Sequence, residues 1–152
     1  MGHIAAESGV NLEKAIEVKS APAEIDRGRM MQTITNLINN AIRFSKNGGS
    51  IWVGIKPADL GGLPGPAAAK MSEERDYYYI YVRDEGAGME KQYLEKIFER
   101  FYQVENANTR KHQGAGLGLS IARNIIEAHG GYIWAESDGP GRGAKICMLL
   151  PE

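Results

Sequence analysis

Glycine-rich segments constrain the fold of this chain more than any other feature of its sequence. The 152 residues contain 19 glycines against 6 prolines, and many of the glycines lie in clusters. Two clusters, at residues 47–49 and 130–131, directly follow segments with helical periodicity, where a glycine can end a helix by adopting a positive φ. The chain is therefore expected to fold into helices and strands of ordinary length, separated by tight turns.

Two segments have the hydrophobic periodicity of amphipathic helices. In residues 27–45 the apolar side chains recur on one helical face, and Asp26 stands before them at the N-cap position. These side chains are Met30, Ile34, Leu37, Ile38, Ala41 and Ile42. In residues 117–129 the expected apolar face consists of Ile121, Ile125 and Ala128.

Five further segments have the alternation, or the aromatic and β-branched content, that is typical of strands. They are residues 11–19, 50–56, 76–84, 132–136 and 144–150. A glycine-rich turn over residues 138–143 joins the last two, which predicts a hairpin. Together the elements predict an α+β domain of two layers, in which helices cover one face of a mixed, mostly antiparallel sheet.

Two stretches are expected to lack long regular elements. Residues 57–75 contain three prolines and an alanine triplet, and they are interpreted as a loop inserted into what is otherwise a hairpin. Residues 85–114 are expected to be irregular apart from a short helix near residues 92–98. No physical role for the 57–75 insertion follows from its sequence.

The composition excludes several classes of protein. With 43% hydrophobic and 24% charged residues in 16.6 kDa, residues 1–152 are expected to form one ordinary soluble domain. A formal net charge of -1 makes nucleic acid a poor candidate partner. The single cysteine, Cys147, excludes an internal disulfide and is expected to be a buried small hydrophobe. No apolar run approaches the ~18 residues of a membrane span.

Gly114, Gly116 and Gly118 form the first motif that indicates chemistry. They alternate with small or apolar residues and open the second helix, whose unpaired N–H groups and positive dipole favour phosphates. The spacing fits neither the dinucleotide fingerprint nor the P-loop. Taken alone, the motif is equally compatible with a flexible hinge that packs against a helix.

The second motif, Asp84-Glu85-Gly86-Ala87-Gly88-Met89, directly follows a predicted strand. A carboxylate at the end of a strand can accept a hydrogen bond from the amino group of a flat ligand, and the glycines let such a ligand lie against the backbone. An ordinary strand-to-loop turn would have the same sequence pattern.

The third motif places Asn36, Asn39 and Asn40 within the first helix, although asparagine is a mediocre helix former. Asn36 and Asn40 are four residues apart and share a face. The Asn40 carbonyl could bind a hard cation such as Mg²⁺, which prefers oxygen ligands, and Arg43 could add a phosphate contact. A solvated helix face is the alternative.

In this order the three motifs resemble the N, G1 and G2 boxes of the GHKL ATP-binding superfamily, and specifically the catalytic ATP-binding domain of sensor histidine kinases. Residues 98–102 resemble the F box of that family, and residues 141–145 resemble the glycine turn before its last strand. The resemblance covers nearly the whole chain and implies a Bergerat-type fold, with ATP and Mg²⁺ as ligands.

The resemblance also implies roles for individual residues. Asn36, Asn40 and Arg43 would serve catalysis, and Asn40 would bind the metal. The implied nucleotide-binding residues are Asn40, Asp84, Gly86, Gly88, Met89, Phe101, Gly114, Gly116, Leu117 and Gly118. Residues 102–114 would form the ATP lid. Phe98 and Phe101 would anchor its base, although two core aromatics are an equally good interpretation.

Asn36 bears on the type of reaction. GHKL enzymes that hydrolyse ATP have a glutamate at this position, and an amide cannot act as a general base at neutral pH. Transfer to a protein acceptor is therefore favoured over hydrolysis. None of the three histidines, His3, His112 and His129, has the acidic and apolar surroundings expected of a phosphoacceptor.

The acceptor is thus expected on the histidine-bearing dimerisation helices of a longer kinase, with a response regulator downstream. The chain would be a monomeric, cytoplasmic piece of that kinase, for which membrane anchoring is one option. Two other functions fit the motifs: a regulatory module that docks a helical partner, and a GHKL serine kinase. Glu85 and Ala144 depart from the usual family pattern.

Overall fold

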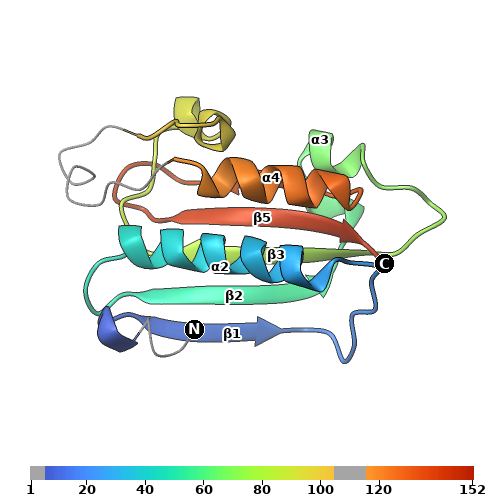
Figure 1. Cartoon of the computed structure of the whole chain (residues 1–152), viewed down its shortest axis with the longest axis horizontal. Coiled ribbons are helices and arrows are strands. Elements are labelled where there is room, and N and C mark those ends of the chain that lie inside the picture. Colours follow the sequence, from blue (N-terminus) through green and yellow to red (C-terminus); the bar gives the residue numbers. More distant parts are fainter. Residues whose placement is uncertain (1–5, 105–115) are drawn as a thin grey trace.

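The computed structural model describes residues 6–104 and 116–152, which form one five-stranded sheet with helices packed on it (Figure 1). The strands are β1 (Asn11–Ile16), β2 (Ser50–Pro57), β3 (Tyr77–Asp84), β4 (Tyr132–Glu136) and β5 (Ala144–Pro151). The helices are α2 (Arg27–Phe44), α3 (Gly65–Ala68) and α4 (Gly118–Ala128). The 3-10 turns are η1 (Leu60–Gly62), η2 (Lys91–Tyr93) and η3 (Lys96–Phe98). The predicted α+β class is confirmed.

The strand order is β1-β2-β3-β5-β4. β1 runs parallel to β2, because α2 forms the crossover between them, and every other neighbouring pair is antiparallel. The sheet is therefore mixed and mostly antiparallel, as predicted. β1 is shorter than the predicted strand over residues 11–19. The Glu17 N–H still bonds to the Ile55 carbonyl, but Pro57 has no N–H with which to continue the ladder.

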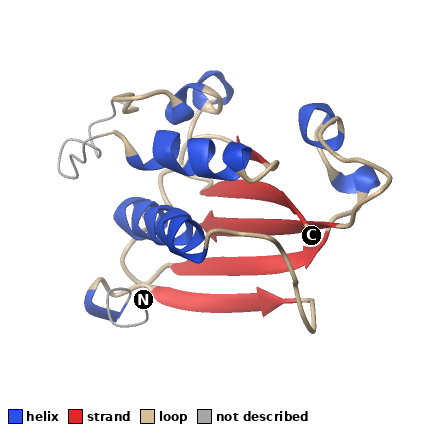
Figure 2. Cartoon of the chain, turned by 45° about the vertical axis from the view of Figure 1, so that its right-hand side comes forward, coloured by secondary structure: helices blue, strands red, loops and turns tan. Residues whose placement is uncertain are grey.

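α2 and α4 lie side by side on one face of the sheet (Figures 1 and 2). Asp26 caps α2 as predicted, since its side chain accepts a hydrogen bond from the Arg29 N–H. The core between the helices and the sheet includes Leu37, Ile38, Ile51, Val82, Ala122, Ile126, Ile133 and Met148. This packing fixes the positions of both helices on the sheet, with α2 against β3 and α4 against β4 and β5.

The apolar face of α4 differs in part from the prediction. Ala122, Ile125 and Ile126 are buried, whereas Ala128 is exposed. Ala128 comes six residues after Ala122 and so points about 240° around the helix from it. Because α4 packs against both α2 and the sheet, its buried face is centred on Ala122.

Residues 57–75 were predicted to be a loop, but they contain η1 and α3 and lie against the opposite face of the sheet (Figure 2). Ala67 of α3 is fully buried in a cluster with Tyr77, Tyr79 and Trp134. These aromatic side chains alternate along their strands with the residues that face α2 and α4. The insertion thus shields part of the face that the two long helices leave uncovered.

Cys147 is buried on this second face, which confirms its prediction as a buried residue. Its sulfur lies 3.2 Å from the Tyr79 hydroxyl. Burial raises the pKa of the Cys147 thiol to about 12. The side chain therefore remains a neutral thiol at physiological pH.

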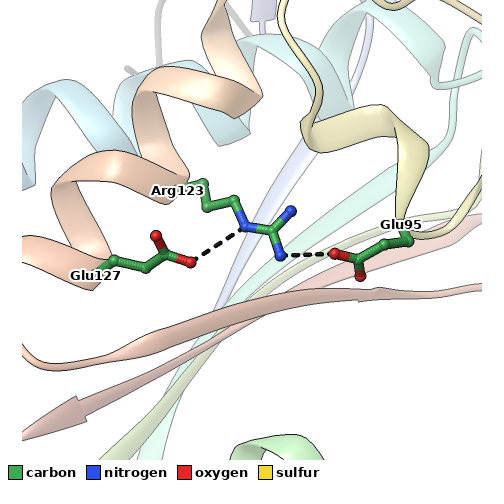
Figure 3. A network of polar contacts seen from close by, with 3 residues as sticks. All are labelled: Glu95, Arg123 and Glu127. Carbon is green, nitrogen blue, oxygen red and sulfur yellow. Dashed lines mark hydrogen bonds and ion pairs between the residues drawn. The ribbon is translucent and has the colours of Figure 1, made fainter.

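The segment after β3 is attached to α4 through Arg123 (Figure 3). Its guanidinium group lies 2.6 Å from the Glu95 carboxylate, 3.2 Å from the Glu127 carboxylate and 5.3 Å from the Phe98 ring centroid. Exposed ion pairs stabilise little, so burial of Ile97 and Phe98 contributes most to holding this segment. The short helix expected near residues 92–98 is in fact the two separate turns η2 and η3.

His129 joins the C-terminal end of α4 to the N-terminal end of α2. Its Nε2 accepts a hydrogen bond of 2.9 Å from the Asp26 N–H, and its Nδ1 lies 2.7 Å from the Ile125 carbonyl. These partners require a neutral ring with the proton on Nδ1. Both ring nitrogens are therefore engaged in structural contacts.

Within residues 6–104 and 116–152, no helix has the length and apolar character needed to cross a membrane.

Candidate functional site

A cavity of about 290 Å³ opens between α2, the start of α4 and the end of β3. Its lining comes from segments far apart in the sequence, because α2 and α4 pack side by side above β3 and β5. The lining residues are Asn36, Leu37, Asn39, Asn40, Ala41, Arg43, Phe44, Val82, Asp84, Ala87, Gly88, Met89, Ile97, Tyr102, Gln103, Val104, Gly116, Leu117, Gly118, Leu119, Ala144 and Ile146.

α2 contributes the polar wall of the cavity. Asn36, Asn40 and Arg43 all line it, as the spacing of three and four residues along a helix predicts. The Asn36 amide also donates a hydrogen bond of 3.4 Å to the Gly118 carbonyl at the start of α4. Asn36 therefore connects α2 to the start of α4 within the wall of the cavity.

Asp84 is the most buried charged group of this cavity, with 8% of its surface exposed. Its Oδ1 accepts hydrogen bonds from the N–H groups of Gly86 (2.8 Å) and Ala144 (3.3 Å). Burial raises the pKa of the Asp84 carboxyl above its ordinary value, although both backbone hydrogen bonds act in the opposite direction. Among the described residues none donates a hydrogen bond to Oδ2, which leaves that oxygen available to a ligand in the cavity.

Gly86 orients Asp84 without lining the cavity itself. A Cβ at Gly86 would lie 1.9 Å from the carbonyl oxygen of Phe44, the last residue of α2. The N–H of Ala87 donates a hydrogen bond of 3.1 Å to the same oxygen. Glycine at position 86 is thus needed for the loop after β3 to approach the end of α2.

The start of α4 contributes the third wall, through Gly116, Leu117 and Gly118. Gly118 is the first residue of the helix, so the unpaired N–H groups and the positive dipole of this end lie beside the cavity. Gly114, the first glycine of the predicted motif, lies outside the described residues, as does most of the predicted lid at 102–114. The three residues that begin the lid, Tyr102 to Val104, line the cavity.

Of the predicted site residues that the structure describes, two are not among the lining residues. Gly86 contributes through its N–H, which donates a hydrogen bond to the Asp84 carboxylate. Phe101 is 73% exposed. Phe101 adopts a positive φ of 62°, and its N–H donates a hydrogen bond of 3.0 Å to the Gly116 carbonyl. It is therefore no core aromatic, unlike Phe98, which is 3% exposed. A contact between the Phe101 ring and a nucleotide stays a prediction.

The sequence carried no signal for the apolar floor of the cavity. The alternation or periodicity of a segment marks its apolar residues only as core and does not show which of them face a cavity. The floor consists of Leu37, Val82, Ile97, Leu119 and Ile146. Ala144, one of the two departures from the family pattern, lies in the lining. Glu85, the other departure, is exposed and outside the lining, where it accepts a hydrogen bond of 3.3 Å from the Ser50 N–H.

The donor set of the cavity suits a cation that brings its own ligands. Within the described part of the chain, no group of three or more His, Cys, Asp or Glu side chains could hold a metal ion. The Asn40 amide supplies one oxygen, which fits Mg²⁺, because that ion keeps several waters and binds substrate phosphates. Arg43 adds positive charge on the same wall.

Comparisons with known proteins identify relatives over most of the chain. The sequence model of the histidine kinase-, DNA gyrase B-, and HSP90-like ATPase family matches residues 25–152. Sensor histidine kinase WalK of Bacillus subtilis is 41% identical over 128 residues, which are 84% of this chain and 18% of WalK. Hybrid signal transduction histidine kinase D of Dictyostelium discoideum is 34% identical over 83% of this chain and 9% of its own length. The chain thus spans less than a fifth of the length of these relatives.

Solved structures share the fold over nearly the full chain. Full-length ShkA in complex with AMPPNP aligns with a TM-score of 0.76 and 26% identity, over 99% of this chain and 27% of ShkA. The nucleotide-free catalytic domain of histidine kinase ThkA aligns with a TM-score of 0.74 and 26% identity, over 98% of this chain and 83% of that domain. ThkA in complex with response regulator protein TrrA aligns with a TM-score of 0.70 and 26% identity, over 98% of this chain and 36% of ThkA.

Proposed function

This chain belongs to the histidine kinase-, DNA gyrase B-, and HSP90-like ATPase family, and we propose that it binds ATP with Mg²⁺ and donates the γ-phosphoryl group to a histidine on the dimerisation helices of a longer sensor kinase. One observation carries the proposal: a single cavity is lined by the asparagine face of α2, the carboxylate at the end of β3 and the start of α4. These walls offer different chemistry, and together they match the parts of a nucleotide.

The end of β3 is the proposed base-recognition wall. Asp84 has one carboxylate oxygen engaged by backbone N–H groups and the other available, so it can accept a hydrogen bond from the exocyclic amine of adenine. Guanine has a carbonyl where adenine has this amine, so an acceptor oxygen would face the acceptor oxygen of the carboxylate and no hydrogen bond could form. The apolar floor, which includes Val82 and Ile146, would contact the faces of the base.

The start of α4 and the polar face of α2 are the proposed phosphate walls. The unpaired N–H groups at Gly118 and beside it would bind phosphate oxygens, and Arg43 would neutralise part of their charge. Asn40 would hold Mg²⁺, which when bound neutralises the charge of the phosphates and fixes their geometry. Phosphoryl transfer needs mostly such positioning and charge neutralisation.

The residues around Asn40 favour transfer over hydrolysis. Asn36 lies one helical turn away and lines the same cavity, but an amide cannot take a proton from water. A histidine brings its own nucleophile: an imidazole nitrogen attacks the γ-phosphorus, a P–N bond forms, and ADP leaves as the bond to the β,γ-bridging oxygen breaks. Glu85, an alternative base, lies outside the cavity lining.

The acceptor is proposed to come from outside this chain. His129 has both ring nitrogens engaged between α2 and α4, and His3 and His112 lie outside the described residues. The longer kinase would then pass the phosphoryl group to a response regulator. A solved complex of a similar kinase with such a protein supports that partner. A cytoplasmic location of the domain is part of the same proposal.

Two other functions use the same site differently. A regulatory module would bind ATP weakly or not at all and would dock a helical partner, and a nucleotide-binding assay separates it from a kinase. A serine kinase of the same superfamily would bind ATP equally well. It differs in having no histidine-bearing paired helices upstream, which the coding sequence of the parent protein would reveal.

A transfer experiment tests the proposed reaction. Incubated alone with labelled ATP and Mg²⁺, the chain is expected to label itself negligibly and to hydrolyse ATP slowly. When the histidine-bearing helices of its own parent are added as a separate protein, they should become labelled, although slowly. Separate chains lack the effective concentration that a tether provides, which is typically on the order of millimolar for short linkers.

The control uses the same helices with the acceptor histidine replaced, which should stay unlabelled. The transferred label should be stable to base and labile to acid, as a phosphohistidine is. A strong acid-labile label on the chain itself would contradict the proposed external acceptor, and brisk steady hydrolysis would contradict the argument from Asn36.

A further inference from the structure

The turn between β4 and β5, residues 137–143, lies outside the cavity. It contacts the loop after β3, residues 85–89, which belongs to the base-recognition wall of the cavity. The Ser137 hydroxyl sits between the two segments. It accepts hydrogen bonds from the N–H groups of Met89 (3.1 Å) and Gly139 (3.3 Å). Its proton has two acceptors within reach, the Gly143 carbonyl at 2.7 Å and the Gly139 carbonyl at 3.3 Å, and the Gly143 contact is the shorter. One proton and two lone pairs are thus all used.

Backbone hydrogen bonds join the same two segments. The Gly141 N–H donates to the Ala87 carbonyl at 2.6 Å, and the Gly143 N–H donates to the Gly86 carbonyl at 3.1 Å. The loop after β3 therefore contacts the turn at several consecutive residues. Of these contacts, the hydrogen bond from the Met89 N–H to Ser137 is the one that depends on a side chain of the turn.

The two segments are packed so closely that neither leaves room for a side chain at the contact. A Cβ at Gly88 would lie 2.2 Å from the Gly139 carbonyl oxygen, and a Cβ at Gly143 would lie 2.1 Å from the Asp84 carbonyl oxygen. Both glycines also have positive φ angles. A shift of the turn would therefore move the loop with it.

The turn also reaches the group proposed to recognise adenine. Ala144, directly after the turn, donates its N–H to Oδ1 of Asp84, and Gly143 beside it accepts the Ser137 hydroxyl proton. Met89, whose N–H Ser137 holds, lines the cavity. Ser137 thus acts on two parts of the base-recognition wall, although it does not itself line the cavity.

We propose that Ser137 is a positioning residue for base recognition: through Met89 and Gly143 it holds the loop and the Asp84 carboxylate in the relative position that selects adenine over guanine nucleotides. The proposal rests on the proposed function, because it concerns the same cavity. It assigns part of the specificity of the site to a turn that contacts no ligand.

The test compares the affinities of Ser137→Ala and the parent chain for ATP and GTP with Mg²⁺, by calorimetry well below the unfolding temperature of each protein. Loss of the hydroxyl is expected to weaken ATP binding about threefold to tenfold. The preference for ATP over GTP should fall by a similar factor. At saturating ATP, the rate of transfer to the histidine-bearing helices should remain that of the parent, because the phosphate walls are unchanged.

Ser72→Ala is the matched control. The Ser72 hydroxyl also accepts a hydrogen bond from a backbone N–H, that of Glu74 at 3.2 Å, but Ser72 is exposed and does not line the cavity. Its loss should change neither affinity nor preference. If Ser137→Ala does not fold, Ser137→Cys provides the same comparison, because it keeps a side chain of similar shape and bonds weakly.

A lower unfolding temperature with unchanged ATP affinity and unchanged ATP-to-GTP preference would overturn the proposal, since a purely structural serine behaves that way. A loss of transfer rate at saturating ATP with normal affinity would also overturn it. If the parent chain itself bound no ATP, the proposed function would fail as well. If the parent binds ATP and the Ser137 variants match it, the positioning role alone is wrong.

Discussion

Replacing Asp84 by alanine is expected to weaken ATP binding by about tenfold to a hundredfold, because a hydrogen bond to a charged acceptor is worth about 1.5–3 kcal/mol. The change removes the acceptor from the end of β3, while the phosphate walls on α2 and α4 stay intact. Discrimination between ATP and GTP should disappear with it. Calorimetry with both nucleotides measures the two effects together, and a variant that keeps the ATP affinity and preference of the parent would refute the adenine assignment.

Asp84→Asn separates binding from stability. Without nucleotide the amide can turn its carbonyl oxygen toward the N–H groups of Gly86 and Ala144, which the carboxylate binds through Oδ1. With ATP bound it can turn the same oxygen toward the adenine amine, so the affinity for ATP should fall less than in the alanine variant. The ligand-free asparagine variant should unfold at a higher temperature than the parent at neutral pH, because it no longer buries a charge. Calorimetry of both proteins without nucleotide measures this difference. A lower unfolding temperature would mean that the ionised carboxylate stabilises the fold.

The direction of the Asp84 pKa shift gives the sign of both pH effects. Burial raises the pKa of this carboxyl, so the folded state favours its protonated form. The associated stability is fully present below the unfolded pKa and is lost as the pH rises through the raised folded pKa. The affinity for ATP should change in the opposite direction. It should decrease as the pH is lowered through the raised pKa of Asp84, because a protonated carboxyl is a poorer acceptor for the adenine amine.

Asn40→Ala is expected to reduce transfer to the histidine-bearing helices on the order of a hundredfold or more, since a catalytic metal contributes several kcal/mol of charge stabilisation. The fold should survive, because Asn40 is only partly buried and lines the cavity. Binding of ATP should lose its dependence on Mg²⁺, while the preference for adenine over guanine persists. Transfer rates, and titrations with Mg²⁺ or a chelator, measure these effects.

Asn124→Ala is the matched control for this change. Asn124 lies on α4, the other amphipathic helix, but it is exposed and does not line the cavity. Its replacement should leave transfer and Mg²⁺ dependence unchanged. An Asn40→Ala variant that transfers at the parental rate would show that Asn40 does not hold the metal.

The elements that could be predicted are those whose pattern is local. The spacing of Asn36, Asn40 and Arg43 predicts a shared helical face, and all three line one cavity. The position of Asp84 at the end of a strand followed from the run of aromatic and β-branched residues before it. In both cases the chemistry depends on residues within a few positions of one another.

The parts that could not be predicted depend on contacts between distant segments. The α3 turn within residues 57–75 is stabilised by burial of Ala67 against the aromatic face of the sheet, and a local pattern does not show what a segment packs on. The apolar floor of the cavity looks like ordinary core in the sequence. Ser137 is inconspicuous, because its role comes from the close approach of two turns, whose contact residues lie 48 positions apart at Met89 and Ser137.

Titration of the chain with ATP and Mg²⁺, followed by calorimetry, tests whether this domain binds nucleotide. One ATP is expected to bind per chain, with a much weaker response to GTP, because the Asp84 wall, the start of α4 and the asparagine face of α2 line a single cavity. The absence of both heat and a thermal shift at millimolar ATP would contradict the claim that this cavity is a nucleotide site.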